Sequence, residues 1–174
     1  NVGNVLQTLG RSAEALVAHE GALAIQRELN DRAGEGLTLT NVGNVHYAWS
    51  DFPRAQSSYE GALALLEEAG DRFHAANTLG NLGNVRWALG DYAGALTLHG
   101  RSLEMKRSVG NRAGQALTLT NLGNAYTSLG DYPKAIAHLQ RARQRVAGGE
   151  QGDEFDHRAR SFTWRQSARR HRAG

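Results

Sequence analysis

The segments NVGNVHYAWS at residues 41–50, NLGNVRWALG at residues 81–90 and NLGNAYTSLG at residues 121–130 are copies of one pattern. They start forty residues apart, and NVGNVLQTLG at residues 1–10 is a further copy at the same spacing. The similarity extends beyond these segments, because DRAGEGLTLTNVGNV at 31–45 returns as NRAGQALTLTNLGNA at 111–125. A period of this length, kept without an insertion, is typical of proteins built from stacked structural repeats.

Each period contains two helical patterns. Leu39, Val42, Gly43 and His46 follow the i, i+3, i+4, i+7 spacing of one helix face. A second stripe, which includes His99, follows later in the period. We therefore expect helices at about residues 1–9, 13–29, 33–49, 53–69, 73–89, 93–109, 113–129 and 133–147.

Turn residues separate these helices at regular places. Gly90-Asp91 and Gly130-Asp131 combine a glycine suited to a helix C-terminus with an aspartate suited to the N-cap of the next helix. Pro53, one of only two prolines in the chain, falls in a predicted first turn, where no backbone hydrogen bond is lost. Glycine and alanine recur at the centres of the stripes, so the two helices of a unit are expected to approach closely. His19 and His99 share the repeat position of Tyr59 and Leu139, and we expect them to be spacers between helices rather than metal ligands.

The repeat predicts an all-α fold, a right-handed superhelical solenoid of antiparallel helix pairs. About four units fit, at residues 1–30, 31–70, 71–110 and 111–147, and the pattern is lost in the tail at 148–174. That tail is expected to be disordered or to form a helix that caps the open end. The chain begins with Asn1 rather than Met, so we expect it to be a piece of a longer protein.

Composition excludes several classes of function. The chain has no cysteine, which removes disulfides and thiolate metal sites. It contains no apolar run near the ~20 residues that a membrane span requires. No metalloprotease, phosphate-loop, dinucleotide or nucleophile-elbow motif occurs. We expect a cytoplasmic protein that is not an enzyme and that has no metal, cofactor or membrane partner.

The pattern resembles the tetratricopeptide repeat. Gly123, Tyr126, Gly130-Asp131-Tyr132 and Ala135 stand at the spacing of that family, over residues 1–147. The forty-residue form with N-L-G-N is similar to repeats of kinesin light chains, G-protein signalling modulators and bacterial regulator arrays. The resemblance implies a scaffold that binds proteins. Leu37, Asn77 and Leu117 stand where the signalling modulators carry an arginine that holds acidic ligands.

The first helix of each pair should line the concave side of the stack, and its polar face carries a repeated amide. A primary amide can pair with both the C=O and the N–H of a peptide backbone. The expected peptide-binding residues are Asn4, Asn44, Asn84 and Asn124, followed one turn later by Gln7, Tyr47, Trp87 and Thr127. The alternative is that each asparagine bonds the neighbouring repeat and only maintains the superhelix.

Arginine at 32, 72 and 112 recurs at the start of the first helices. Each is expected to pair with a nearby acid such as Asp31 or Asp71, or else to form a basic row at the edge of the groove.

The predicted function is to bind a peptide or protein segment in the concave groove. One alternative is a sensor or autoinhibitory arm of a multidomain, ATP-dependent regulator. Nucleic acid is not the expected partner, because basic residues without acids gather only in the tail between Arg158 and Arg172. The open ends of the stack could also pair two copies of the chain.

Overall fold

The computed structural model describes residues 2–147, and its regular structure over that range is entirely helical. The helices are α1 (Val2–Thr8), α2 (Ser12–Glu28), α3 (Arg32–Ala48), α4 (Phe52–Glu68), α5 (Arg72–Ala88), α6 (Tyr92–Ser108) and α7 (Arg112–Ser128). A last helix covers residues 132–147. These bounds lie within one or two residues of those expected, and no strand occurs in the described range.

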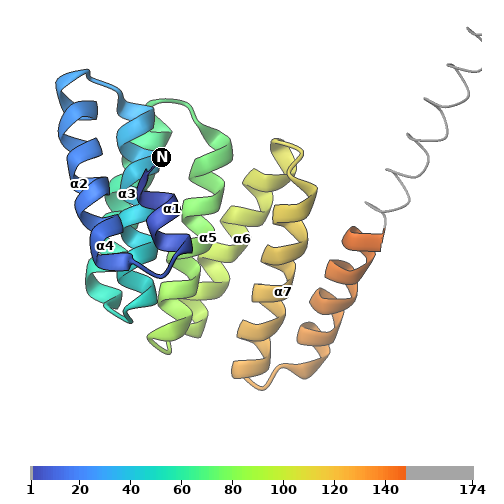
Figure 1. Cartoon of the computed structure of the whole chain (residues 1–174). Helices are drawn as coiled ribbons and strands as arrows, with labels where there is room; N and C mark the ends of the chain where they lie inside the picture. Colours follow the sequence, from blue (N-terminus) through green and yellow to red (C-terminus); the bar gives the residue numbers. More distant parts are fainter. Residues whose placement is uncertain (1, 148–174) are drawn as a thin grey trace, which may run out of the picture.

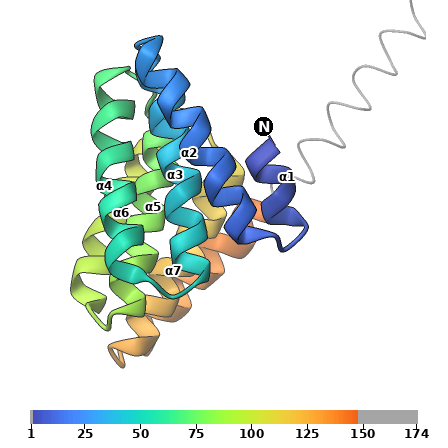
Figure 2. The ribbon, with the colours of Figure 1, turned by 60° about the vertical axis from the view of Figure 1, so that its left-hand side comes forward.

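Consecutive helices pack against each other as antiparallel pairs, and the pairs stack from α1 at one end to the last helix at the other (Figure 1). The turned view in Figure 2 shows α2 and α4 along one side of the stack. Helix α5 also contacts both α3 and α7, so the first helices of successive units form a continuous layer. The predicted all-α solenoid is confirmed. The division into four units stays a prediction, and the tail at 148–174 lies outside the described residues.

The turns have the chemistry that the sequence predicts. The Asp91 side chain accepts a hydrogen bond from the backbone N–H of Gly94, over 2.9 Å, and so caps α6. Asp31, Asp51, Asp71 and Asn111 cap α3, α4, α5 and α7 in the same way. Gly90 adopts the left-handed conformation at φ 80°, whereas Ser50 takes that place at φ 59° before α4.

Close packing within a unit depends on a glycine in the first helix. A Cβ on Gly43 would lie 2.5 Å from Cε1 of Tyr59, and one on Gly83 would lie 2.6 Å from Cε1 of His99. Both partner side chains are almost completely buried. The expected spacer role of His99 therefore agrees with the packing, since its ring fills the position that Tyr59 fills one unit earlier.

Arg32 pairs with a nearby acid as expected, but the acid is Glu35 rather than Asp31, and Arg72 forms no ion pair within residues 2–147. Arg32 lies 3.7 Å from Oε2 of Glu35, and Arg72 donates to Oγ of Ser108 over 3.4 Å. Asp31 and Asp71 accept backbone N–H groups of their own helices, which directs their carboxylates toward the helix start rather than toward the arginines.

No helix in residues 2–147 is long and apolar enough to cross a bilayer.

Candidate functional site

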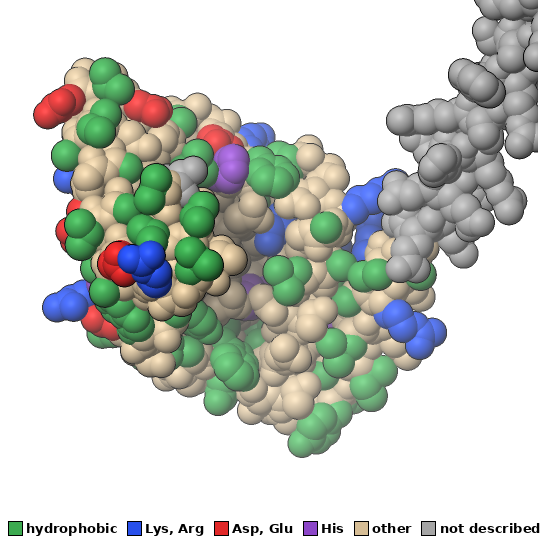
Figure 3. All heavy atoms as spheres, in the orientation of Figure 1, with side chains coloured by type: hydrophobic (Ala, Val, Ile, Leu, Met, Phe, Trp, Pro, Cys, Tyr) green, Lys and Arg blue, Asp and Glu red, His purple; other side chains and the backbone are tan. Residues whose placement is uncertain are grey.

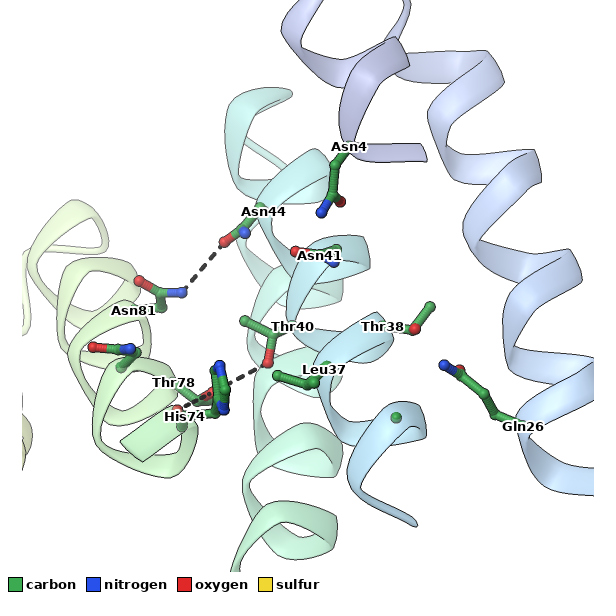
Figure 4. Close-up of a pocket in the computed structure, with 12 residues that line it drawn as sticks. Asn4, Gln26, Leu37, Thr38, Thr40, Asn41, Asn44, His74, Thr78 and Asn81 are labelled. Carbon is green, nitrogen blue, oxygen red and sulfur yellow. Dashed lines mark hydrogen bonds between the residues drawn. The ribbon is translucent and has the colours of Figure 1, made fainter. Parts of the chain in front are cut away.

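The repeated asparagines form hydrogen bonds between successive units. Nδ2 of Asn81 on α5 donates to Oδ1 of Asn44 on α3 over 3.3 Å, and Nδ2 of Asn121 on α7 donates to Oδ1 of Asn84 on α5 over 3.0 Å. Figure 4 shows the first of these contacts crossing between the two helices. For Asn44 and Asn84, a bond to the neighbouring repeat therefore occupies one atom of the side chain, its oxygen.

The other atom of the ladder amide has no such role. Within residues 2–147, Nδ2 of Asn44 and Nδ2 of Asn84 donate to no side chain or backbone group. Both asparagines are half-buried and line pockets. Each amide thus keeps two N–H donors that can bind a carbonyl oxygen from outside the chain.

The first pocket, which we call the amide pocket, lies between α1, α2, α3 and α5 and has a volume of about 540 Å³. Its lining is mostly amides, hydroxyls and backbone, and Leu37 adds an apolar side chain. Figure 4 shows side chains from these helices pointing into the same space. The lining residues are Asn4, Gln26, Gly34, Leu37, Thr38, Thr40, Asn41, Asn44, His74, Asn77, Thr78 and Asn81.

The second pocket, which we call the aromatic pocket, has a volume of about 240 Å³ and lies further along the same layer of helices. It is lined by Tyr47, Asn84, Trp87, His99, Asn121 and Asn124. The space-filling view shows that the molecule is hollowed near the middle of the face seen in Figure 3. A pocket that combines two aromatic side chains with three amides can hold an apolar side chain beside a backbone.

The units differ in one side chain that lines the aromatic pocket. In the preceding unit, the Tyr59 hydroxyl donates to Oδ1 of Asn44 over 2.8 Å. His99 occupies the same repeat position beside Asn84, but it lacks the length and the hydroxyl to make that contact. Its Nδ1 is buried without a hydrogen-bond partner in the described residues. The smaller ring therefore leaves space beside Asn84 that tyrosine would fill.

Six of the eight predicted binding residues line one of the two pockets. Asn4 and Asn44 belong to the amide pocket, and Asn84, Asn124, Tyr47 and Trp87 belong to the aromatic pocket. Gln7 and Thr127 line neither pocket. The Thr127 hydroxyl bonds the Gly123 carbonyl of its own helix over 2.9 Å.

The two predicted aromatic residues differ in exposure. Tyr47 is half-buried, and its ring meets the Phe52 ring edge-on with 5.7 Å between the centroids. Trp87 remains 42% exposed, and its Nε1 donates to Oγ of Ser128 over 3.2 Å. Because this bond orients the indole while its surface stays open, Trp87 is the better placed of the two for contact with a ligand.

A second row of amides was not among the predicted binding residues. Asn41, Asn81 and Asn121 precede the ladder asparagines by three residues, so they lie on the same helix face. The sequence pattern that could have identified them is the first asparagine of N-x-G-N, which recurs every forty residues just as the second asparagine does. Thr78 was also missed: its hydroxyl lies 3.1 Å from that of Thr40 across the two units.

Among residues 2–147, no Lys, Arg, Asp or Glu lines either pocket, and the titratable side chains that do are Tyr47, His74 and His99. Burial lowers the pKa of His99 to about 4, with a further contribution from the charge of Lys106, so its ring is neutral. The described residues also contain no group of three His, Asp or Glu side chains that could hold a metal ion. An amide-rich lining without Lys, Arg, Asp or Glu suits a neutral peptide backbone.

Comparison with known proteins gives one family. The model described as Tetratricopeptide repeat matches residues 1–68 and 74–146. Among curated proteins, none matches the sequence.

Several solved structures share the fold. BtubC (BKLC) from P. vanneervenii superposes with a TM-score of 0.78 at 24% identity, over 86% of this chain and 62% of BtubC. The apo form of RapI gives 0.74 at 19% identity, over 85% of this chain and 42% of RapI. A Podosopora anserina protein described as a kinesin light chain with nearly identical TPR-like repeats gives 0.68 at 15% identity, over 86% and 73%. The chain thus spans less than two thirds of BtubC and of RapI, and these likenesses show the fold.

Proposed function

Because this chain belongs to the tetratricopeptide repeat family, whose members generally mediate contacts between proteins, we propose that it binds an extended segment of a partner protein. The site is the surface formed by the amide pocket and the aromatic pocket. The chain would act as a scaffold without catalysis, as members of this family generally do.

The observation that supports this most directly is that the oxygen and the nitrogen of the ladder amides have different roles. The oxygens of Asn44 and Asn84 accept hydrogen bonds from the next unit, and their N–H groups remain available beside a pocket. Fixed oxygens hold the side chains in one orientation, so a ligand carbonyl would meet donors that are already ordered. Ordering before binding reduces the entropy lost on association.

The chemistry of the two pockets suggests which part of the ligand each would take. The amide pocket offers many polar groups and one leucine, which suits backbone and small polar side chains. The aromatic pocket places Trp87 and Tyr47 beside Asn84. An apolar or aromatic ligand side chain would fill its 240 Å³, and large aromatic residues of this kind often contribute most of the binding energy.

The other functions considered from the sequence stay predictions. A regulatory arm would use the same groove and would differ only in the domain that responds to binding. Nucleic-acid contact depends on residues between Arg158 and Arg172, which lie outside the described range.

The decisive variant is His99→Tyr, because Tyr59 already shows that tyrosine is tolerated at this repeat position. The new hydroxyl should reach Asn84, fill the aromatic pocket and leave the helices stacked. Peptides selected from a random phage-displayed library on the full chain provide the probe. We expect His99→Tyr to weaken the selected peptides at least tenfold and to leave thermal unfolding close to that of the parent.

The matched control is Glu104→Gln, which changes an exposed residue of α6 that lines neither pocket. It should bind the selected peptides normally. If His99→Tyr binds them as tightly as Glu104→Gln while remaining folded, the aromatic pocket is not the binding site.

A further inference from the structure

A third cavity, of about 300 Å³, lies away from both pockets, between α6, α7 and the last helix. It is lined by Arg107, Gln115, Leu119, Arg141, Gln144 and Arg145. Within residues 2–147, three arginines and two glutamines line this one space, and no Asp or Glu does. We call this site the arginine cavity.

The three arginines are unpaired within residues 2–147, where none of them takes part in an ion pair with a carboxylate. The same place in an earlier unit is different. Nε of Arg27 lies 2.6 Å from Oε1 of Glu35, and these residues precede Arg107 and Gln115 by two whole repeats. The replacement of the acid by Gln115 therefore removes the internal partner of Arg107 and leaves an amide in its place.

Of the other two arginines, one is an addition to the repeat. Arg145 is that addition, since earlier units carry Ile25, Leu65 and Met105 there. Arg141 stands where the first two units carry glycine and the third already carries Arg101. Stacking of the helices therefore does not require arginine at either position. The three arginines are exposed, so water screens much of their mutual repulsion, and an anion bound in the cavity would be attracted by all three.

The electrostatic effect of the cluster is seen at a neighbouring residue. Burial lowers the pKa of His138, and the charges of Arg141 and Arg107 lower it further. The His138 ring stacks on Tyr126 with 5.3 Å between the centroids, so it contributes packing rather than a compensating charge.

We propose that the arginine cavity binds a phosphate group. Guanidinium groups present pairs of parallel N–H donors that match phosphate oxygens, and a dianion balances several of them better than one carboxylate would. The exposed Gln144 amide supplies further donors, whereas Nε2 of the buried Gln115 already donates to the Lys106 carbonyl over 3.3 Å. The phosphate would come either from a free ion or from a phosphorylated side chain of a partner. This site is separate from the peptide groove, and either can operate without the other.

The key variant is Gln115→Glu, which restores the acid that Glu35 provides in the earlier unit. The new carboxylate should pair with Arg107 and compete with the ligand. The probes are inorganic phosphate, a phosphoserine peptide, its unphosphorylated twin and a twin with glutamate in place of phosphoserine, all at constant ionic strength. Binding is followed by NMR of the arginine Nε–Hε signals in the full chain.

We expect saturable binding that weakens at least tenfold in Gln115→Glu and in Arg141→Gln, without a lower melting temperature in Gln115→Glu. Arg143→Gln is the matched control, because it removes the same charge from the same helix at a residue outside the cavity. It should change affinity less than twofold. Tighter binding of the phosphoserine peptide than of inorganic phosphate identifies a modified partner, and equal binding of both identifies a free ion.

Three results would overturn the proposal. They are the absence of saturable binding by either phosphate probe, equal losses in Arg143→Gln and Arg141→Gln, and glutamate binding as tight as phosphoserine binding. The second would mean a diffuse basic surface, and the third would mean a site for acidic peptides.

Discussion

Asn121 on α7 donates a hydrogen bond from Nδ2 to Oδ1 of Asn84 on α5, over 3.0 Å, and so joins two successive units through their side chains. Asn81 and Asn44 repeat the contact one unit earlier at 3.3 Å. The ladder asparagines are thus partly structural, whatever they bind. Their oxygen and nitrogen can be tested separately, because aspartate keeps the acceptor and loses the donor.

Asn84→Asp should separate folding from binding. The carboxylate still accepts from Asn121, so the free energy of unfolding should change little, whereas a ligand carbonyl loses its donor and peptide affinity should fall at least tenfold. Asn84→Ala should impair both, with a loss of stability of about 1 kcal/mol. Urea unfolding and peptide titration on the same proteins measure the two effects.

Gln7→Glu is the control, because it adds the same negative charge outside both pockets and should bind the peptides normally. A loss of peptide affinity in that variant would attribute the effect of Asn84→Asp to charge.

Trp87→Ala should weaken peptide binding by about 2 kcal/mol, since an exposed and oriented indole in a pocket is a typical hot spot. Trp49 provides the comparison, because it is similarly exposed, at 47%, but lines neither pocket. Trp49→Ala should leave affinity unchanged. Titration calorimetry with the selected peptides measures both. Equal losses in the two variants would place the ligand elsewhere.

Gly83→Ala should destabilise the fold by about 1–3 kcal/mol, because the added Cβ would lie 2.6 Å from the His99 ring in a closely packed interior. Gly100→Ala tests the same change in open surroundings, where a Cβ meets nothing within 4 Å. It should stabilise α6 by about 0.5–1 kcal/mol through the lower entropy of the unfolded chain. Chemical denaturation of both variants checks the opposite signs. A neutral Gly83→Ala would show that the His99 ring can move aside.

Stability should fall as the solution becomes acidic. Burial holds the pKa of His99 at about 4 in the folded chain, below its ordinary value of 6.5. The unfolded chain therefore binds a proton first, and stability is lost as pH falls from about 6.5 toward 4. Between pH 7 and pH 5 this residue should cost about 2 kcal/mol of unfolding free energy.

His99→Leu is the control for this pH effect, because Leu139 occupies the same position one unit later. Urea unfolding at both pH values should show a smaller loss in the variant than in the parent. Burial lowers the pKa of His19 as well, so some pH dependence should remain. An identical loss in parent and variant would show that His99 is not the group responsible.

The helices and their caps could be predicted from the sequence because they depend on residues within four positions of each other. Asp91 caps α6 through the backbone N–H of Gly94, and the spacing of Val42, Gly43 and His46 indicates a buried helix face in any context. The stacking of the helix pairs could also be predicted, because the pattern repeats every forty residues and each unit must cover the apolar face of the unit before it. Six of the eight expected groove residues line pockets for the same reason.

The hydrogen-bond partner of each polar side chain could not be predicted from such local patterns. Asn84 and Asn121 are separated by 37 positions, and their one-letter codes do not show that an oxygen is occupied while a nitrogen is available. Gln7 and Thr127 line neither pocket although they belong to the same pattern as Tyr47 and Trp87. The sequence analysis assigned no site to Arg107, Arg141 and Arg145, which only the packing of α6 beside the last helix brings to one cavity. Local patterns specify helices through short-range backbone contacts, whereas the partner of a side chain depends on distances that arise only once those helices have packed.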